Sequence, residues 1–226
     1  MFDRISPTYD LLNHLLSLGR DLAWRCRTAG MLARSGRLRV ADLATGTGDL
    51  LIALLRNGPP VAEMVGLDVS ERMLEVCRRK LRRDGLESRV TLLRADASAT
   101  PFPDAAFDAV TMAFGIRNTR DVKATLREVH RILKPGGAAL ILEFSLPRNR
   151  VLRWCHLKYL RLGVPLVGAV VSGDRHAYRY LNESIEAFHP PHEFCALMTE
   201  SDFVEVSATP LTWGVASIYR GLKDPG

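Results

Sequence analysis

LRVADLATGTGD, residues 38–49, is the stretch that decides the fold. Its apolar run over 38–44 leads directly into Gly46-Thr47-Gly48, which is typical of a buried strand that enters a tight glycine turn before a helix. Glycines at such a turn let the backbone approach a ligand closely, and a helix over 50–57 would present unpaired N–H groups at its start. The stretch therefore predicts a ligand site at the end of the first strand.

Asp68 adds a second element to this site. It ends another apolar run, residues 64–67, and a carboxylate there can accept hydrogen bonds from both hydroxyls of a ribose. The alternative is a strand–turn–helix unit whose glycines only form the turn. Because Asp49 and Asp68 accompany the glycines, we expect the first half of the chain to bind a nucleoside.

Two residues indicate which nucleoside is expected. A dinucleotide site usually has Gly-x-Gly-x-x-Gly, but the third glycine position is Leu51, whose bulk would block close helix–strand packing around a pyrophosphate. Asp49 also places a carboxylate where a phosphate would lie. S-adenosylmethionine carries a ribose, a sulfonium and an ammonium group but no phosphate. We therefore favour it over NAD, and a dehydrogenase is disfavoured.

The composition limits the class of protein. The chain has 226 residues and is 47% hydrophobic, which suits one large α/β domain with a sizeable core. No apolar run is long enough for a transmembrane helix, and the N-terminus has no signal-peptide pattern. The formal charge of +6 is compatible with an anionic membrane or with nucleic acid, and decides neither. His189 and His192 lack an evident third ligand, so no metal site is expected.

Strands and helices alternate along most of the chain. This alternation predicts an α/β fold with a doubly wound, mostly parallel sheet of seven strands, a final antiparallel strand and a helical lid. Ligands of such sheets bind at the carboxyl ends of the strands, where Gly46–Asp49, Asp68, Asp96 and Arg117 all fall. The strands are expected at 39–44, 62–69, 89–94, 107–114, 138–144, 203–208 and 215–220, and the helices at 50–57, 71–84, 122–133, 175–186 and 192–201.

A single domain over 1–226 is expected. Leucines at helical spacing near the N-terminus indicate either an amphipathic cap over the core or a lid over the mouth of the substrate site. The four expected segments are a helical cap or lid (1–36), a cofactor-binding core (37–145), a helical segment for substrate and membrane (146–200) and a terminal strand pair (201–222).

The stretch 148–161 is both basic and aromatic. No acidic residue occurs between Glu143 and Asp174, so this part of the chain is purely cationic. It is either a helix packed on the core or a helix that lies on an anionic membrane. The basic helix over 71–84 has no interleaved aromatic residue, and we interpret it as a solvated face and not as a nucleic-acid site. The cations of the first stretch are Arg148, Arg150, Arg153, Lys158 and Arg161.

At several places the chain resembles the class I S-adenosylmethionine-dependent methyltransferases, and more specifically the quinone-biosynthesis C-methyltransferases that serve menaquinone and ubiquinone. The glycine motif alone is not specific, whereas Phe114-Gly115-Ile116-Arg117-Asn118 is. The resemblance covers essentially the whole chain. It is carried by Met1-Phe2-Asp3, Tyr9-Asp10-x-x-Asn13, residues 44–50 and 113–118, Lys134-Pro135-Gly136-Gly137, Leu142-Glu143-Phe144-Ser145-x-Pro147, Tyr178-x-Tyr180-Leu181-x-x-Ser184-Ile185-x-x-Phe188 and Leu211-Thr212-x-Gly214.

The resemblance implies a Rossmann-like fold with S-adenosylmethionine as cofactor. From the residues themselves, Asp96 after the third strand is a candidate acceptor for the exocyclic amine of adenine. Ala113 stands where some family members have serine, so a side-chain contact at that position is lost. The expected cofactor-binding residues are Gly46, Thr47, Gly48, Asp49, Asp68, Asp96, Ala97 and Ala113.

The family chemistry implied is methyl transfer to a ring carbon of a prenylated quinol. Removing a proton from the adjacent hydroxyl makes that carbon nucleophilic, but a phenol has a pKa of about 10. Arg117 cannot act as an ordinary base, so we expect it to stabilise the phenolate through a water. Tyr9 and Asn118 are the catalytic candidates for orienting the hydroxyls, and Asn13, Tyr178 and Tyr180 are weaker substrate candidates.

Demethylmenaquinol is the expected substrate. The alternatives are a polyprenyl benzoquinol of ubiquinone biosynthesis and a soluble small molecule. A nucleic-acid methyltransferase is disfavoured because Phe114-Gly115-Ile116-Arg117 replaces Asn/Asp-Pro-Pro-Tyr/Phe after the fourth strand. A cofactor-binding module without catalysis is disfavoured by the presence of Arg117. Since a prenyl tail resides in the bilayer, we expect a cytoplasmic protein with a membrane-associated face, and the sequence is compatible with a homodimer.

Overall fold

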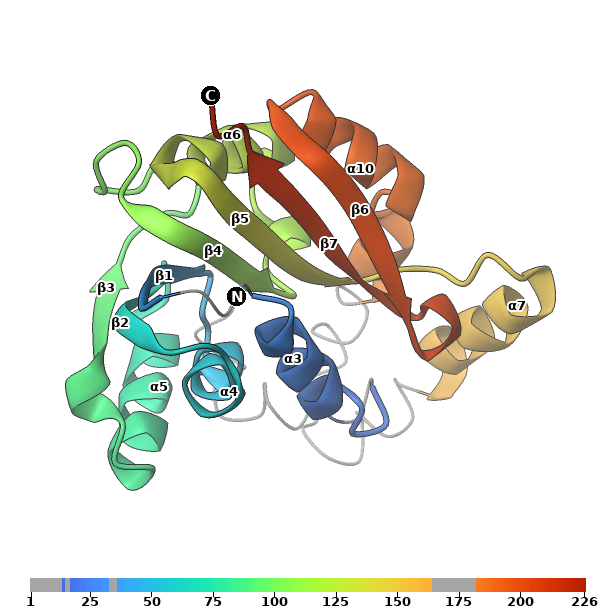
Figure 1. The fold of residues 1–226 in the computed structure, drawn as a ribbon. Coiled ribbons are helices and arrows are strands. Elements are labelled where there is room, and N and C mark those ends of the chain that lie inside the picture. Colours follow the sequence, from blue (N-terminus) through green and yellow to red (C-terminus); the bar gives the residue numbers. More distant parts are fainter. Residues whose placement is uncertain (1–13, 15–16, 33–35, 164–181) are drawn as a thin grey trace.

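The structure is a computed structural model, and it describes residue 14 and residues 17–32, 36–163 and 182–226. The described residues include seven strands, which form one sheet in the order β3-β2-β1-β4-β5-β7-β6 (Figure 1). The strands are β1 (Leu38–Leu43), β2 (Val61–Asp68), β3 (Val90–Arg94), β4 (Phe107–Ala113), β5 (Leu133–Phe144), β6 (Phe203–Leu211) and β7 (Ala216–Lys223).

Parallel pairing dominates this sheet. β1 pairs in parallel with β2 and β4, β2 with β3, and β4 with β5. β7 lies antiparallel between β5 and β6, because the short turn after β6 returns the chain in the opposite direction. The predicted fold, a mostly parallel seven-stranded sheet with an antiparallel strand at the end of the chain, is confirmed.

Helices cover both faces of the sheet (Figure 1). One core packs α3, α4 and α5 against one face, and the other packs α6 and α10 against the opposite face. Neighbouring strand residues serve the two cores alternately, as Val40 and Ala41 do in β1. The helices are α3 (Asp21–Gly30), α4 (Asp49–Asn57), α5 (Glu71–Arg83), α6 (Val122–Ile132), α7 (Arg150–Lys158) and α10 (Pro191–Thr199), with short turns η1 (Glu87–Arg89), η2 (Ile116–Asn118), η3 (Tyr159–Gly163) and η4 (Thr212–Gly214).

Side-chain caps set the start of three of these helices, namely α7, where Asn149 Oδ1 accepts from the backbone N–H groups of Val151 and Leu152, and α5 and α6. Ser70 Oγ accepts a hydrogen bond from the backbone N–H of Met73 at 3.2 Å, and Asp121 Oδ1 accepts one from that of Ala124 at 3.0 Å. Each cap satisfies a backbone donor that has no partner within its helix. Ser70 and Asp121 are therefore the N-cap residues of α5 and α6.

The structure corrects some predicted boundaries. β5 begins at Leu133 and not at residue 138, because Leu133 already pairs with Phe107 before an irregularity in register. The two terminal strands extend to Leu211 and Lys223, well beyond 208 and 220. Most of the helix expected over 175–186 lies outside the described residues. The part that is described belongs to a helical stretch over 182–187.

Leu51, at the third position of the glycine motif, packs closely against the sheet. Its side chain is fully buried, and a Cβ added to Gly66 would lie 2.7 Å from its Cδ1 atom. The space that a third glycine on α4 would have provided comes instead from a glycine on β2. The large side chain on α4 thus packs against a residue without a side chain on β2, and the helix stays close to the strand.

Candidate active site

A cavity of about 250 Å³ opens at the carboxyl ends of β1 to β4. Because these strands are parallel, their ends meet at one edge of the sheet. Gly46 follows β1, Asp68 ends β2, Asp96 follows β3 and Phe114 follows β4. The structure therefore brings Gly46, Asp68 and Asp96 together, as the strand pattern predicted. The remaining lining residues are Ala44, Leu67, Val69, Met73, Ala95, Ala97, Gly115, Asn118, Thr119 and Arg120.

Asp68 joins the glycine turn to the end of β2. Its Oδ2 atom accepts the backbone N–H of Gly46 at 2.8 Å, and its Oδ1 atom accepts that of Ser70 at 2.9 Å. These bonds hold the carboxylate in place at the wall of the cavity. A carboxylate is an acceptor of the kind that ribose hydroxyls require.

Asp96 lies at the adjacent part of the wall. The backbone N–H and the hydroxyl of Ser98 both donate to its Oδ1 atom, at 2.9 and 2.7 Å. These bonds lower the pKa of Asp96, and Arg120 contributes in the same direction. Asp96 therefore stays ionised, and its Oδ2 atom is suited to accept from an amine such as that of adenine.

The glycine turn itself has left-handed backbone. Gly46 and Gly48 have φ values of +57° and +86°, and a Cβ at Gly48 would lie 2.4 Å from Cys77 Sγ. Thr47 is buried behind the turn, where its hydroxyl accepts from Lys80 Nζ at 3.2 Å. Gly46 thus faces the cavity, whereas Gly48 and Thr47 shape the turn from the other side.

Asp49 meets a cation of the protein itself. Its Oδ1 atom lies 2.5 Å from Lys80 Nζ, and both side chains are largely buried. The two residues line a different cavity, between α3, α4 and α5. The structure thus does not bring Asp49 to the cavity at the strand ends, and its charge is balanced by Lys80.

Asp42 lies beneath the turn, fully buried near the end of β1. The hydroxyls of Thr45 and Thr111 each donate to it at 2.6 Å. Burial raises the pKa of Asp42 to about 6, although these hydroxyls lower it. Asp42 therefore connects the loop after β1 to β4 through two hydroxyl groups. Its own carboxyl has an unusually high pKa.

Asn118 and Arg117 converge on the carbonyl oxygen of Phe114. Asn118 Nδ2 donates to it at 3.1 Å, and Arg117 Nη1 at 3.0 Å. Phe114 itself has a φ of +57°, which is uncommon for a residue with a side chain. Asn118 lines the cavity directly, and Ala113 ends the strand just before Phe114. The two polar side chains thus stabilise the backbone that forms this part of the wall.

Arg117 is buried and paired with Glu143 of β5. Its Nη1 atom donates to Glu143 Oε1, and its guanidinium lies 5.4 Å from the ring centroid of Phe144. Burial raises the pKa of Glu143, and the positive charge of Arg117 opposes that rise. The guanidinium therefore lies behind Phe114 and is not part of the cavity lining that the described residues form.

Aromatic rings support the wall from the side of α3. Phe114 stacks on Phe144 at a centroid distance of 4.5 Å, and Trp24 contacts both rings at 6.4 and 6.1 Å. The indole N–H of Trp24 donates to Thr212 Oγ1 at 2.9 Å. α3 is thereby connected both to the cavity wall and to the turn between β6 and β7.

The catalytic candidate Tyr9 and the substrate candidates Asn13, Tyr178 and Tyr180 lie outside the described residues and stay predictions. Two of the lining residues, Phe114 and Arg120, were not expected in the site, although Phe114 belongs to the motif that carries the family resemblance. Phe114 could have been found because it directly follows the fourth strand at the ligand-binding edge. Arg120 has no such signal, since its position depends on how the loop after η2 folds back.

The donor set of the cavity fits S-adenosylmethionine. Two carboxylates line a wall that is otherwise largely apolar, and the Gly46 N–H is already bonded to Asp68. A phosphate would meet Asp68 and Asp96 as like charges, whereas a nucleoside without phosphate would meet hydrogen-bond acceptors. Gly115 lets the segments after β1 and β4 pack closely at the cavity, because a Cβ there would lie 2.7 Å from Cβ of Ala44.

Comparisons with known proteins show which family the chain resembles over nearly its whole length. The sequence model of the ubiE/COQ5 methyltransferase family matches residues 1–223. Demethylmenaquinone methyltransferase of Thermus thermophilus is 47% identical over 221 residues, which are 98% of this chain and 99% of that protein. The ubiquinone/menaquinone biosynthesis C-methyltransferase UbiE of Geobacter sulfurreducens is 43% identical over 223 residues, which are 99% of this chain and 87% of that protein.

A solved structure shares the fold. The S-adenosylmethionine-dependent methyltransferase of Thermotoga maritima described as a possible histamine N-methyltransferase superposes with a TM-score of 0.69. The alignment covers 99% of this chain and 98% of that one, at 20% identity. At this identity the likeness shows the fold alone.

Proposed function

The chain belongs to the ubiE/COQ5 methyltransferase family, and from that premise we propose that it methylates a ring carbon of demethylmenaquinol. It is an S-adenosylmethionine-dependent C-methyltransferase of quinone biosynthesis. The choice of a naphthoquinol is supported by the name of the Thermus thermophilus relative. The name of the Geobacter sulfurreducens relative includes ubiquinone as well, so a polyprenyl benzoquinol is the second candidate.

The observation that carries the proposal is the division of the cavity into two parts. Asp68 and Asp96 provide the acceptors that a ribose and an adenine need. In this proposal Phe114, Gly115 and Asn118 form the other part, which offers apolar backbone surface and an amide. An apolar aromatic ring with hydroxyl groups is complementary to that second part.

S-adenosylmethionine, when bound, supplies an electrophilic methyl group on a positively charged sulfur. The residues of the chain must make the ring carbon nucleophilic by favouring the quinol anion. In this proposal Asn118 orients a hydroxyl at the wall, and Arg117 stabilises the phenolate through a water from its position behind Phe114. Tyr9 remains a candidate for the second hydroxyl. Holding ring and methyl group in line accounts for much of the acceleration.

The prenyl tail of such a substrate belongs in the bilayer. In the part of the chain that the structure describes, no helix is both long and apolar enough to cross a membrane. In this proposal the enzyme reaches the substrate by contact with the membrane surface. The basic, aromatic stretch 148–161 supports this contact, because most of its side chains are exposed.

The test is methyl transfer from labelled S-adenosylmethionine to demethylmenaquinone, with and without a reductant. Product that forms only with the reductant is the expected result, since the quinol and not the quinone can lose a hydroxyl proton. Transfer to a demethylated benzoquinol alone would move the enzyme to the ubiquinone pathway. Transfer to neither acceptor, with the cofactor still bound, would contradict the proposal. Asp108→Asn is a control variant for this assay. Asp108 lies at the end of β4 away from the cavity, so its substitution should leave methyl transfer unchanged.

A further inference from the structure

α7 projects from the body of the protein with unusually little burial. All eight residues from Arg148 to Cys155 are exposed, and only His156 of the helix is buried. Surface helices normally bury an apolar stripe against their own core. Here Val151 and Trp154 are instead 69% and 62% exposed. An apolar helix face of this kind indicates a partner outside the chain.

Trp213 is displayed beside this helix, in the turn between β6 and β7. Its side chain is 79% exposed and its φ is +58°. The residues on either side are held by the body of the protein: Thr212 Oγ1 accepts from Trp24 Nε1, and the carbonyl of Gly214 accepts from Ser145 Oγ, both at 2.9 Å. Trp213 is therefore an exposed aromatic side chain on an anchored turn.

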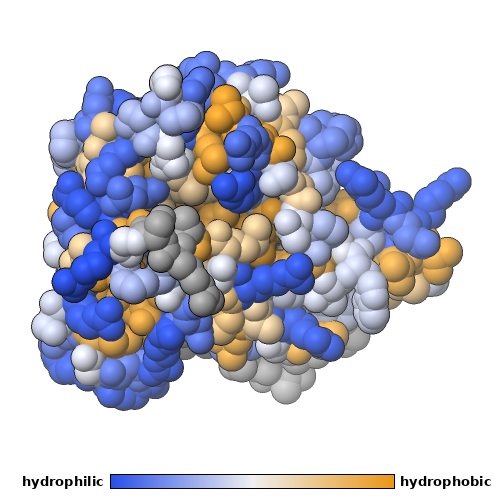
Figure 2. Space-filling model, in the orientation of Figure 1, coloured by the Kyte–Doolittle hydropathy of each residue, from blue (hydrophilic) through white to orange (hydrophobic). Residues whose placement is uncertain are grey.

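The turn and the helix belong to one surface. A Cβ added to Gly214 would lie 3.3 Å from Cα of Pro147 and 4.0 Å from the backbone nitrogen of Arg148, just before α7. Figure 1 shows the β6–β7 turn beside α7 at one end of the molecule. Figure 2 shows apolar side chains gathered next to strongly hydrophilic ones at that same end. We call this surface, formed by residues 148–162 and Trp213, the α7 face.

The charge of the α7 face is positive. Arg161 is neutralised by a bidentate pair with Glu186, which removes it from the predicted set of membrane-contacting cations. Arg150, Arg153 and Lys158 pair with no carboxylate among the described residues, and Lys158 Nζ lies 5.8 Å from the ring centroid of Trp154. Two copies of this face would repel each other, whereas an anionic surface would attract it.

From these observations we infer that the α7 face docks on the surface of an anionic phospholipid bilayer, with Trp154 and Trp213 at the level of the headgroups. Tryptophan is enriched at this depth, aliphatic side chains reach the acyl boundary, and cations meet the lipid phosphates. The inference rests on the proposed function only for its purpose, which is access to a quinol in the bilayer. The turn places one tryptophan beyond the helix, so that docking also fixes the orientation of the protein.

Intrinsic fluorescence tests the docking directly, because the chain has three tryptophans and the third, Trp24, is buried. The full chain is mixed with quinol-free vesicles of phosphatidylglycerol and phosphatidylcholine that carry brominated acyl chains. We expect the emission of Trp154 and Trp213 to be quenched and shifted to the blue. In the Trp154→Phe/Trp213→Phe protein, the remaining emission of Trp24 should not change. Vesicles of pure phosphatidylcholine, and high salt, should abolish most of the effect.

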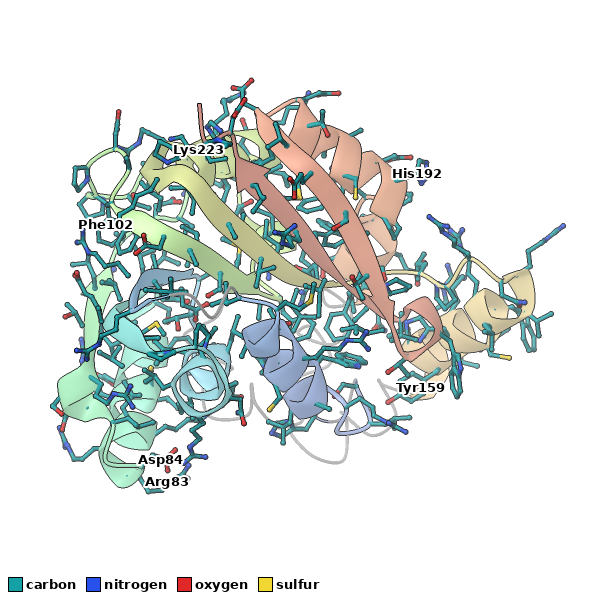
Figure 3. The ribbon with its side chains drawn as sticks, viewed as in Figure 1. Arg83, Asp84, Phe102, Tyr159, His192 and Lys223 are labelled. Carbon is teal, nitrogen blue, oxygen red and sulfur yellow. The ribbon has the colours of Figure 1, made fainter. Side chains whose placement is uncertain are left out.

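A pair of charge-matched variants tests the site on the surface. Arg150→Gln/Arg153→Gln should weaken vesicle partitioning about 25-fold, at about fivefold for each arginine. Arg79→Gln/Arg127→Gln removes the same charge from exposed positions on α5 and α6 and should have a much smaller effect. α5, whose end carries Arg83 and Asp84, lies at the other end of the molecule from Tyr159 next to α7 (Figure 3). Equal losses in both variants would overturn the inference.

The remaining outcomes separate docking from catalysis. Arg150→Gln/Arg153→Gln should lose vesicle binding but still methylate a quinol with a truncated, soluble tail at the normal rate. That result would support both proposals. Quenched tryptophans without methylation of any quinol would support docking and contradict the proposed substrate. Docking through this face would be contradicted if the unmodified chain did not bind vesicles. It would also be contradicted if the unmodified chain were a dimer, and Trp154→Ala were a monomer that still bound vesicles.

Discussion

Arg117 and Glu143 form a buried ion pair that joins the loop after β4 to the end of β5. Nη1 of Arg117 donates to Oε1 of Glu143, and the two side chains are 3% and 0% exposed. The backbone N–H of Phe144 also donates to Glu143, at 2.8 Å. The pair thus fixes the position of the Phe114 carbonyl and the wall of the cavity. A cation chosen from the sequence for its chemistry also has a structural role.

These two roles can be separated by substitution. Arg117→Ala leaves Glu143 buried without a partner, so we expect about 3–5 kcal/mol of lost unfolding free energy together with a severe loss of turnover. Arg117→Met/Glu143→Gln removes both charges and should recover most of the stability. If turnover stays low in this double variant while cofactor affinity is near normal, Arg117 acts on the substrate. If turnover returns with stability, measured by urea unfolding, its role is structural and the phenolate proposal fails.

Asp68 should control cofactor affinity. Asp68→Asn keeps one acceptor oxygen but removes the charge, and hydrogen bonds to charged groups contribute about 1.5–3 kcal/mol. We therefore expect binding of S-adenosylhomocysteine, measured by calorimetry, to weaken about 10- to 100-fold. Asp108→Asn alters a carboxylate that pairs with Lys134 at the other end of β4, and its affinity should match the unmodified protein. An unchanged affinity in Asp68→Asn would exclude Asp68 as the ribose acceptor.

Asp42 should make stability depend on pH. Its pKa is about 6 in the folded protein and 3.8 ordinarily. Between about pH 4 and pH 6 the folded protein keeps a proton that the unfolded chain releases, so this carboxyl lowers stability as pH rises, by about 3 kcal/mol in all. Asp42→Asn has no such loss, and its unfolding free energy relative to the unmodified protein should rise with pH across that window.

Asp108 provides a control of opposite sign for this measurement. Hydrogen bonds from Lys134 and from the Arg39 N–H outweigh burial and lower the pKa of Asp108. Its contribution to stability is present above the ordinary pKa and is lost as pH falls through the folded value. The stability of Asp108→Asn relative to the unmodified protein should therefore fall as pH rises. Parallel pH profiles for Asp42→Asn and the unmodified protein would contradict the raised pKa of Asp42.

Leu51 and Gly66 should behave as a coupled pair. Gly66→Ala brings a Cβ to within 2.7 Å of Leu51 and 2.8 Å of Leu92, and overpacking of this kind costs about 1–3 kcal/mol. Leu51→Ala leaves a cavity that costs about 2–5 kcal/mol. The double variant should lose less unfolding free energy than the sum of the two. Strict additivity would show that the contact is unimportant. Gly30→Ala, with open space around it in α3, is the control and should lose no stability.

The strand ends could be predicted because their signals are local. Apolar runs that lead into Gly46 and Asp68 define buried strands, and parallel pairing necessarily brings the ends of such strands to one edge. For the same reason the approach of Asp96 to Asp68 needed no tertiary information beyond the order of elements. The start of β5 was missed because Lys134-Pro135-Gly136-Gly137 ends a helix by its local signal, whereas pairing of Leu133 with Phe107 is a long-range contact.

By itself, the sequence determined the order of the elements, the sheet and the edge at which a ligand binds, since these depend on periodicity and on turn-forming residues near in the chain. The tertiary structure decided which partner each buried or charged side chain meets. Asp49 is neutralised by Lys80, Arg117 by Glu143 and Arg161 by Glu186, all across long separations in sequence. Such pairs form where packed elements place opposite charges at contact distance and exclude water, which no local pattern specifies.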